Sequence, residues 1–468
     1  MATLKEKIGY GFGDMSSSMF WKIFSAYLPF FYASVFHLSL EMTGALMLVT
    51  RIWDAVSDPM MGIIADRTQT KWGKYRPYLL WISIPFAVAG VLLFTTPGWG
   101  ETGNTIWAFI TYILMMTVYT AINVPYGSML GVMTEDSNEK TVFSSYRMFF
   151  AYAGSFIVLW SWEPLCNFFA KMNGVAVEGE SLTRDPQSWQ FAMIVVGVCC
   201  MLLFWLTFAM TREHVVTFKK STSVQSDLGS LFKNGPWWIL LGGVLFFNFF
   251  NAIRYSIIPF YFATLIAKDA SISFLSMDFL FYAGIFLAVG EIANMIGVAM
   301  ATPITFKLGK KSTFLVSLFA LMVLCAAFYY VPTCGSSAYW TLLILQILVC
   351  ILTGVISPLV WSMYADISDY AELKFKTAST GLIFSSSSMA QKFGGALGGA
   401  AVMWLLKGFG FDPAEGATQT EGAVEGLRLL MSWIPAGVAA LSALFIFIYP
   451  LTTKRMEDIN KQLHEIRH

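Results

Sequence analysis

Long apolar stretches recur along the chain and are separated by short polar segments. A helix that crosses the hydrocarbon core of a membrane needs about 20 mostly apolar residues. Stretches of this kind lie at residues 8–36, 42–65, 78–97, 105–130, 143–169, 190–211, 237–266, 278–303, 313–332, 338–365, 377–407 and 426–450. The pattern therefore predicts an all-α membrane protein with about twelve transmembrane helices.

The composition supports a protein surface that is solvated by lipid. Of the 468 residues, 56% are hydrophobic and 13% are charged, whereas about 25% of the residues in a soluble domain are charged. The net charge of +1 gives no reason to expect a nucleic-acid partner. The sequence also lacks the H-E-x-x-H, G-x-S-x-G and P-loop motifs. We therefore expect neither an enzyme nor a cofactor.

The basic residues indicate which side of the membrane each loop faces, because cytoplasmic loops are enriched in lysine and arginine. Twenty of the 30 lysines and arginines lie in one alternating set of loops, and five lie in the opposite set. The richer set includes both chain ends. We therefore expect cytoplasmic termini and an even number of spans in the plasma (inner) membrane.

The two halves of the chain resemble each other. The segment Pro125-Tyr-Gly-Ser-Met returns 233 residues later as Pro358-Leu-Val-Trp-Ser-Met. Parallel duplication of this kind is typical of major-facilitator transporters, so we predict two six-helix bundles in that architecture. The predicted parts are an N-terminal bundle (1–211), a cytoplasmic central loop (212–236), a C-terminal bundle (237–450) and a cytoplasmic tail (451–468).

Polar residues follow one face of the first predicted helix. Asp14, Ser18, Lys22 and Ser25 are spaced so that they form a stripe on an otherwise aromatic helix. A charge inside the membrane is costly and needs a partner or a purpose. We predict that the stripe lines a substrate cavity. The alternative is that Asp14 only anchors the cytoplasmic end of the helix.

The second predicted helix carries Arg51, Asp54 and Asp58 on one face. Two carboxylates one turn apart repel each other unless a cation joins them, and carboxylate oxygens are preferred ligands of hard cations. We predict a site for Na⁺ or H⁺ here, in which Thr120 and Asn123 of the fourth helix complete the shell or meet a substrate hydroxyl. A structural ion-pair network with Arg51, and ordinary interhelical contacts of the fourth-helix pair, are the alternatives.

Further charges lie within apolar runs. Arg147 and Lys392 are lone cations on the fifth and eleventh helices, and they are suited to donate to sugar hydroxyls or to pair with the second-helix aspartates. Arg254 and Glu291 are expected to form an ion pair that joins the seventh and eighth helices. The 16 tryptophans and 19 tyrosines suit a sugar carrier, since aromatic faces stack on sugar rings.

Several motifs resemble one known family. They are Arg51-Ile-Trp-Asp-Ala-Val-Ser-Asp-Pro-Met-Met-Gly with the following Asp66-Arg-Thr-Gln-Thr-Lys-Trp-Gly-Lys-Tyr-Arg-Pro, Gly9-Tyr-Gly-Phe-Gly-Asp, Asn123-Val-Pro-Tyr and Tyr364-Ala-Asp-Ile-Ser-Asp-Tyr. Over essentially its whole length the chain resembles the glycoside–pentoside–hexuronide:cation symporters, the family of the melibiose permease. The resemblance implies symport of a sugar or glycoside with Na⁺ or H⁺ by alternating access. We also expect a functional monomer in contact with membrane lipid.

The resemblance also implies roles for single residues. Asp54 and Asp58 match the aspartates that bind the coupling cation, and Thr120 matches a fourth-helix threonine of that family. Arg147 matches a sugar-contacting arginine and Lys392 an eleventh-helix lysine.

The chain also departs from the galactoside carriers of that family. Asn123 and Ser18 stand where those carriers have aspartates, Asp14 lies one turn before Ser18, and Gly127 replaces a tryptophan that stacks on galactose. With Tyr126 of the fourth-helix motif, the predicted substrate contacts are Asp14, Ser18, Lys22, Asn123, Tyr126, Arg147 and Lys392. A lysolipid carrier is the alternative, because animal lysolipid symporters resemble this fold and share the paired second-helix aspartates.

Overall fold

The structure, a computed structural model, describes residues 3–134, 137–175, 182–214, 231–274, 277–375, 380–414 and 416–467. Most of the predicted central loop, residues 215–230, therefore lies outside the described residues. The contacts divide the chain into two units. Unit 1 consists of Met1–Phe218, Ile258–Glu291 and Met403–Val424, and unit 2 consists of Lys219–Ile257, Ile292–Val402 and Glu425–His468.

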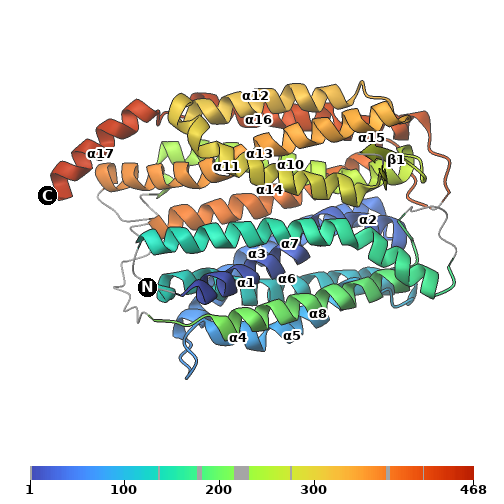
Figure 1. The fold of residues 1–468 in the computed structure, drawn as a ribbon, viewed down its shortest axis with the longest axis horizontal. Coiled ribbons are helices and arrows are strands. Elements are labelled where there is room, and N and C mark those ends of the chain that lie inside the picture. The colour runs from blue at the N-terminus through green and yellow to red at the C-terminus, as the bar shows by residue number, and fades with distance from the viewer. Residues whose placement is uncertain are drawn as a thin grey trace. The chain divides into compact units, whose positions relative to one another are not determined.

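Unit 1 contains the first helices of the chain and one short β-hairpin (Figure 1). The helices are α1 (Leu4–Ala26), α2 (Leu28–Phe30), the π-helix η1 (Phe31–Val35), α3 (Leu40–Arg67), α4 (Arg76–Trp81), α5 (Ser83–Leu93), α6 (Gly100–Met133), α7 (Ser137–Met172) and α8 (Pro186–Met210). Strands β1 (Ser271–Phe274) and β2 (Met277–Leu280) pair antiparallel, with Ser271 opposite Leu280. Within the unit, α1 packs against α7 and α8, and α3 packs against α6.

Unit 2 contains α12, α13, α16 and α17, of which α12 packs against α13 and α16. Helices α10, α11, α14 and α15 contribute residues to both units. Their bounds are α10 Gly235–Leu265, α11 Ala283–Leu308, α12 Lys310–Phe328, α13 Ser336–Phe375, α14 Thr380–Gly408, α15 Glu421–Met431, α16 Trp433–Ile448 and α17 Thr453–Arg467.

The predicted all-α membrane class is confirmed. Among the described residues, eight helical stretches are long and apolar enough to cross a membrane: α6, α7, α8, α10, α11, α12, α13 and the run Glu421–Ile448 through α15 and α16. Two shorter apolar stretches are Leu40–Thr50 and Ser83–Leu93. The number of twelve spans remains a prediction.

Helix α1 begins at a capping box, in which the Thr3 side chain accepts from the backbone of Glu6 and the Glu6 carboxylate accepts from the backbone of Thr3. This arrangement satisfies two backbone N–H groups that the first turn would otherwise leave unpaired. Further along, a Cβ added at Gly9 would lie 2.4 Å from Cβ of Met210. Only glycine permits this approach of α1 to α8, as is common where helices pack inside membranes.

The segment after α8 fixes the loop that precedes α4. The carboxylate of Glu213 accepts from the backbone N–H groups of Lys74 (2.8 Å), Tyr75 (2.7 Å) and Arg76 (2.9 Å). The Arg76 guanidinium in turn donates to the carbonyl of Phe208 at 2.7 Å. A carboxylate at the first turn of a helix satisfies N–H groups that have no partner within the helix. This end of unit 1 is therefore held by directed polar contacts.

Unit 2 has a comparable anchor. Nζ of Lys310, at the start of α12, lies 2.7 Å from both carboxylate oxygens of Asp366 on α13. Nζ of Lys311 donates to the carbonyl of Tyr449 at 2.8 Å. Helix α17 packs against α13 and buries Met456 and Ile459.

Candidate functional site

The two second-helix aspartates lie on α3, one turn apart. Asp54 is buried, with 3% of its surface exposed, and Asp58 is partly exposed. Oγ1 of Thr120 on α6 donates to Oδ1 of Asp58 at 2.8 Å. The structure thus brings together Asp58 and Thr120, as the sequence predicts for a cation site. The side chain of Arg51 lies outside the described part of the structure.

Asn123 makes contacts that the sequence does not predict. Its Nδ2 donates to the carbonyl of Tyr119 at 3.1 Å, and its Oδ1 accepts from Oγ of Ser17 at 2.7 Å. Ser17 is buried on α1, next to the predicted stripe residue Ser18. Asn123 therefore joins the helix that carries Thr120 to the helix that carries the polar stripe.

The stripe on α1 forms one partly exposed face. Asp14, Ser18, Lys22 and Ser25 are all partly exposed, whereas Ser16 and Ser17 between them are buried. That this face lines a substrate cavity stays a prediction. The chain around them also packs closely, because α1 contacts both α7 and α8.

Asp14 pairs with Arg147 of α7. Nε of Arg147 lies 2.9 Å from Oδ2 of Asp14, and Nη2 lies 3.5 Å from Oδ1. The guanidinium also lies over the ring of Tyr126, 5.3 Å from its centre. Tyr126 itself is fully buried and donates to the carbonyl of Tyr10 at 2.6 Å. The structure therefore places Tyr126 behind Arg147, in a position that supports the guanidinium.

Lys22 pairs with Glu291 of α11, with Nζ 2.6 Å from Oε1. The Glu291 side chain is fully buried and the Lys22 side chain is 18% exposed. The sequence predicted Arg254 as the partner of Glu291. Arg254 instead donates to the carbonyl of Met431 at 2.9 Å and to the side chain of Gln346, within unit 2.

An aromatic pair beside the stripe was not predicted from the sequence. Trp21 on α1 is partly exposed, and its ring lies 5.4 Å from that of Tyr119 on α6 and 5.3 Å from that of Phe24. Sixteen tryptophans gave no means of choosing this one. Its position directly before Lys22 of the polar stripe is the only signal that the sequence offered. Lys392, the last predicted contact, lies partly buried on α14 in unit 2.

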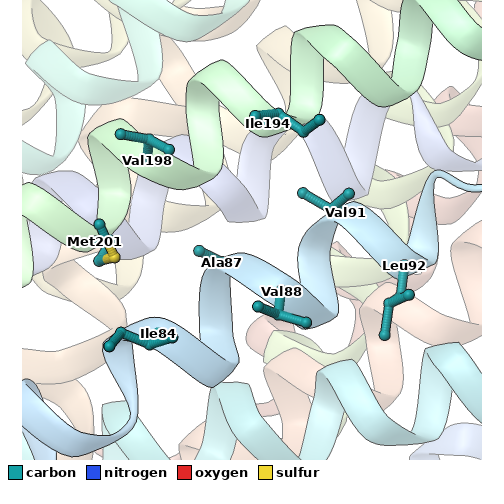
Figure 2. Close-up of a pocket in the computed structure, with 8 residues that line it drawn as sticks. All are labelled: Ile84, Ala87, Val88, Val91, Leu92, Ile194, Val198 and Met201. Atoms are coloured by element: carbon teal, nitrogen blue, oxygen red, sulfur yellow. The ribbon is translucent and has the colours of Figure 1, made fainter.

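A groove of about 310 Å³ lies between α5 and α8 (Figure 2). It is lined by Ile84, Ala87, Val88, Val91, Leu92, Ile194, Val198 and Met201. None of these eight side chains offers a hydrogen-bond donor or a strong acceptor, so the groove does not suit a sugar. In the described residues no group of three or more His, Cys, Asp or Glu side chains forms a metal site.

Comparison with known proteins places the chain in a family. Residues 9–453 match the family described as MFS/sugar transport protein. The chain is 33% identical over its full length to a putative glycoside/cation symporter, YagG of Escherichia coli (strain K12), and covers 95% of that protein. It is 31% identical to an isoprimeverose transporter of Lactiplantibacillus pentosus, over 99% of this chain and 92% of that protein.

Solved structures show the same fold at low identity. The crystal structure of the nucleoside transporter NupG superposes with a TM-score of 0.64 at 14% identity and covers 95% of this chain and 100% of its own. A bacterial homologue of the human peptide transporters PepT1 and PepT2 gives a TM-score of 0.67 at 11% identity, over 99% of this chain and all of that chain. The helices, the match over almost the whole chain and the full-length relatives together show that this chain is a multi-pass membrane transporter that belongs to the MFS/sugar transport family.

Proposed function

We propose that the protein is a symporter that imports a sugar or glycoside together with Na⁺ or H⁺ and is not an enzyme. The observation that carries this proposal is the pair Asp54 and Asp58 on α3, one of them buried and the other bonded to Thr120 of α6. Two carboxylates one turn apart, of which one is buried, favour a bound cation over the empty state. The family and the glycoside/cation symporter among the relatives support the same function.

The cation and the sugar occupy neighbouring regions of unit 1 in this proposal. Asp54, Asp58 and Thr120 hold the cation. Asp14, Ser18, Lys22 and Arg147 line the sugar site, and Trp21 offers an aromatic face. Tyr126 acts as a positioning residue, because its buried ring lies under the Arg147 guanidinium. Lys392, on α14 in unit 2, remains a substrate contact predicted from the sequence alone.

Asn123 connects the two regions. It stands three residues after Thr120 on α6 and accepts a hydrogen bond from Ser17 of α1. A cation that draws Asp58 and Thr120 together also fixes α6, and α6 then fixes the stripe on α1 through this bond. The bound cation thus pre-organises the sugar site, which is how a ligand at one site raises affinity at another.

The coupling follows from charge. Without a cation, two neighbouring carboxylates carry like charges, and closing the protein around them is costly. The bound cation neutralises these acids and so lowers the cost of moving the loaded cavity through an occluded state. The empty and the fully loaded carrier change conformation, and the half-loaded one does not. In this proposal the protein lies in the inner membrane with both termini in the cytoplasm, because cytoplasmic loops are enriched in basic residues. The polar face of α1 favours a sugar over a lysolipid as the substrate.

The test is uptake by purified protein in proteoliposomes. We expect concentrative uptake of a glycoside driven by a Na⁺ gradient or by a pH gradient, each imposed alone, which also identifies the cation. Asp58→Asn keeps an oxygen but removes the charge, so it should abolish accumulation while exchange between equal sugar pools persists. Full accumulation by the Asp58→Asn protein would disprove the cation site, and a lysolipid as the only transported compound would disprove sugar transport.

A further inference from the structure

The sugar-facing part of unit 1 contains two cations, and each is bonded to an acid. Nε of Arg147 lies 2.9 Å from the Asp14 carboxylate, and Nζ of Lys22 lies 2.6 Å from the Glu291 carboxylate. The four groups together carry no net charge. We propose that the substrate is an uncharged glycoside and that sugar acids and sulfonated sugars are poor substrates. This inference rests on the proposed sugar symport.

The first reason is electrostatic. A carboxylate or sulfonate on the sugar that reached Arg147 would also come close to Asp14, which shares the same guanidinium. Two negative charges that contact the same guanidinium repel each other, and the repulsion becomes stronger as water is excluded and the effective dielectric constant falls. An anion-binding site needs a cation whose charge is not already balanced, and neither Arg147 nor Lys22 meets this condition.

The second reason is the direction of the hydrogen bonds. Carboxylates only accept hydrogen bonds, whereas guanidinium and ammonium groups only donate. A sugar hydroxyl both donates and accepts, so a single hydroxyl, or two neighbouring ones, can donate to Asp14 and accept from Arg147. An anionic group has no hydrogen to give to Asp14. A mixed pair of donor and acceptor therefore fits a polyol better than it fits an anion.

The third reason is the spacing of the two ion pairs. Asp14 and Lys22 are eight residues apart on α1, which corresponds to about 12 Å along the helix axis. Ser18 stands between them on the same partly exposed face. This distance exceeds the width of a single sugar ring, so hydroxyls at both ends of a glycoside find polar partners. Trp21 is partly exposed beside Lys22 and offers an apolar face to one ring.

The experiment compares matched glycosides on the purified, full-length protein by isothermal titration in detergent. The pairs are p-nitrophenyl glucosides against glucuronides and galactosides against galacturonides, each in the α and β forms. Within each pair only the group at C6 differs. We expect the neutral member of the best-bound pair to have a Kd at least about tenfold lower than its anionic counterpart.

Asp14→Asn tests the cause of the selectivity. It preserves the shape of the side chain but leaves the Arg147 charge unbalanced, so the ratio of the two Kd values should shift at least about tenfold towards the anionic glycoside. Glu41→Gln is the matched control, because it removes an acid from the exposed Glu41–Lys407 pair, also in unit 1. The ratio should not change in this control.

Two results would overturn the inference and leave sugar symport intact. The first is equal or tighter binding of the anionic glycosides by the unmodified protein, which needs no variant and so does not depend on the folding of Asp14→Asn. The second is an unchanged ratio in a folded Asp14→Asn protein. If no glycoside of the panel binds and none is taken up under either cation gradient, the proposed function itself is wrong, and the inference falls with it.

Discussion

Gly13 determines how closely the ring of Tyr126 approaches α1. A Cβ added at this position would lie 2.3 Å from Cε2 of Tyr126, and that ring is stacked on Tyr10 with 4.8 Å between centres. The ring of Tyr126 therefore cannot move away from α1 without displacing Tyr10. Since the same ring supports Arg147, a change of one atom at Gly13 should reach the sugar site.

We expect Gly13→Ala to destabilise the protein by about 1–3 kcal/mol, the usual cost of overpacking, and to weaken sugar binding. Gly127→Ala is the control, because a Cβ added there meets no atom within 4 Å. Alanine at that position should be neutral or slightly stabilising, since it favours the helix by up to about 1 kcal/mol over glycine. Thermal unfolding in detergent and sugar titration measure both effects. Equal losses in the two variants would show that the contact between Gly13 and Tyr126 is not the cause.

The bond between Ser17 and Asn123 provides a second prediction at the scale of single residues. Ser17→Ala removes a buried hydrogen bond worth about 1 kcal/mol, so we expect it to reduce the factor by which the cation increases sugar affinity. Sugar affinity without the cation should change little. The measurement is sugar titration with and without the coupling cation.

Ser16→Ala is the matched control for Ser17→Ala. Ser16 is also buried on α1, but its Oγ donates to the carbonyl of Cys200 on α8 at 3.0 Å. Both variants should lose similar stability, and only Ser17→Ala should lose coupling. A comparable loss of coupling in Ser16→Ala would mean that the effect comes from general loosening of α1.

The spacing of residues along a helix predicted which groups share a face, but the partner of each group depends on how the helices rotate against one another. Asp58 and Thr120 meet as predicted. Neighbouring serines differ by about 100° around a helix axis, so the sequence alone could not tell that Ser17 faces Asn123 while Ser18 faces the partly exposed side. The Lys22–Glu291 pair spans 269 residues, a separation at which no helical pattern carries information.

At the scale of elements, the start of α1 is tied to the segment that follows α8. Nε2 of His214 lies 2.7 Å from Oε1 of Glu6, and the Glu6 carboxylate also accepts from the backbone and hydroxyl of Thr3. Burial by itself would raise the pKa of Glu6, but the hydrogen bonds from His214 and Thr3 outweigh it and lower the pKa below its usual value of 4.5. The folded state therefore stabilises the charged form of Glu6.

A lowered pKa in the folded protein means that Glu6 contributes stability above its unfolded pKa, near 4.5, and loses that contribution as the pH falls through its folded value. We expect Glu6→Gln to lower the Tm at neutral pH. As the pH falls below about 4.5, the Tm of this variant should approach that of the unmodified protein. Thermal unfolding measured from acid to neutral pH follows the difference.

When His214→Asn is introduced into both proteins, the difference in Tm between the Glu6→Gln and the Glu6 forms should become smaller. The reason is that His214 is the partner that lowers the pKa of Glu6 most. A difference between the Glu6→Gln and unmodified proteins that stays constant across the whole pH range would show that the contact does not depend on the charge of Glu6.

At the scale of the whole molecule, the sequence predicts on which side each connection lies. Cys334 is exposed in the segment between α12 and α13, which the distribution of basic residues predicts to lie outside the cytoplasm. We expect a membrane-impermeant maleimide to label Cys334 in intact cells, and Cys334→Ser to remove this labelling. Thr452→Cys, exposed before α17, should react only after the membrane is permeabilised. Labelling of Cys334 only after permeabilisation would reverse the proposed orientation.

The fold class was readable from the sequence because long apolar stretches have few structural solutions in a membrane. The division of the chain into two units was harder to predict from the sequence. The sequence repeat divides the chain near its middle, whereas Ile258–Glu291 and Met403–Val424 from the second half belong to unit 1. Contacts such as the bond from the backbone N–H of Gly284 to Glu163, at 2.9 Å, decide this membership, and hydropathy does not record them.

The Lys22–Glu291 pair also bears on how the protein is made. Chains grow at about 5–20 residues per second, and 269 residues separate the two partners, so Lys22 is synthesised about 13 to 54 s before Glu291. During that interval α1 must keep a charged lysine hydrated or bound to another partner, because an unpaired charge within a bilayer is costly. The bond between Lys22 and Glu291 therefore forms only after α11 has been made.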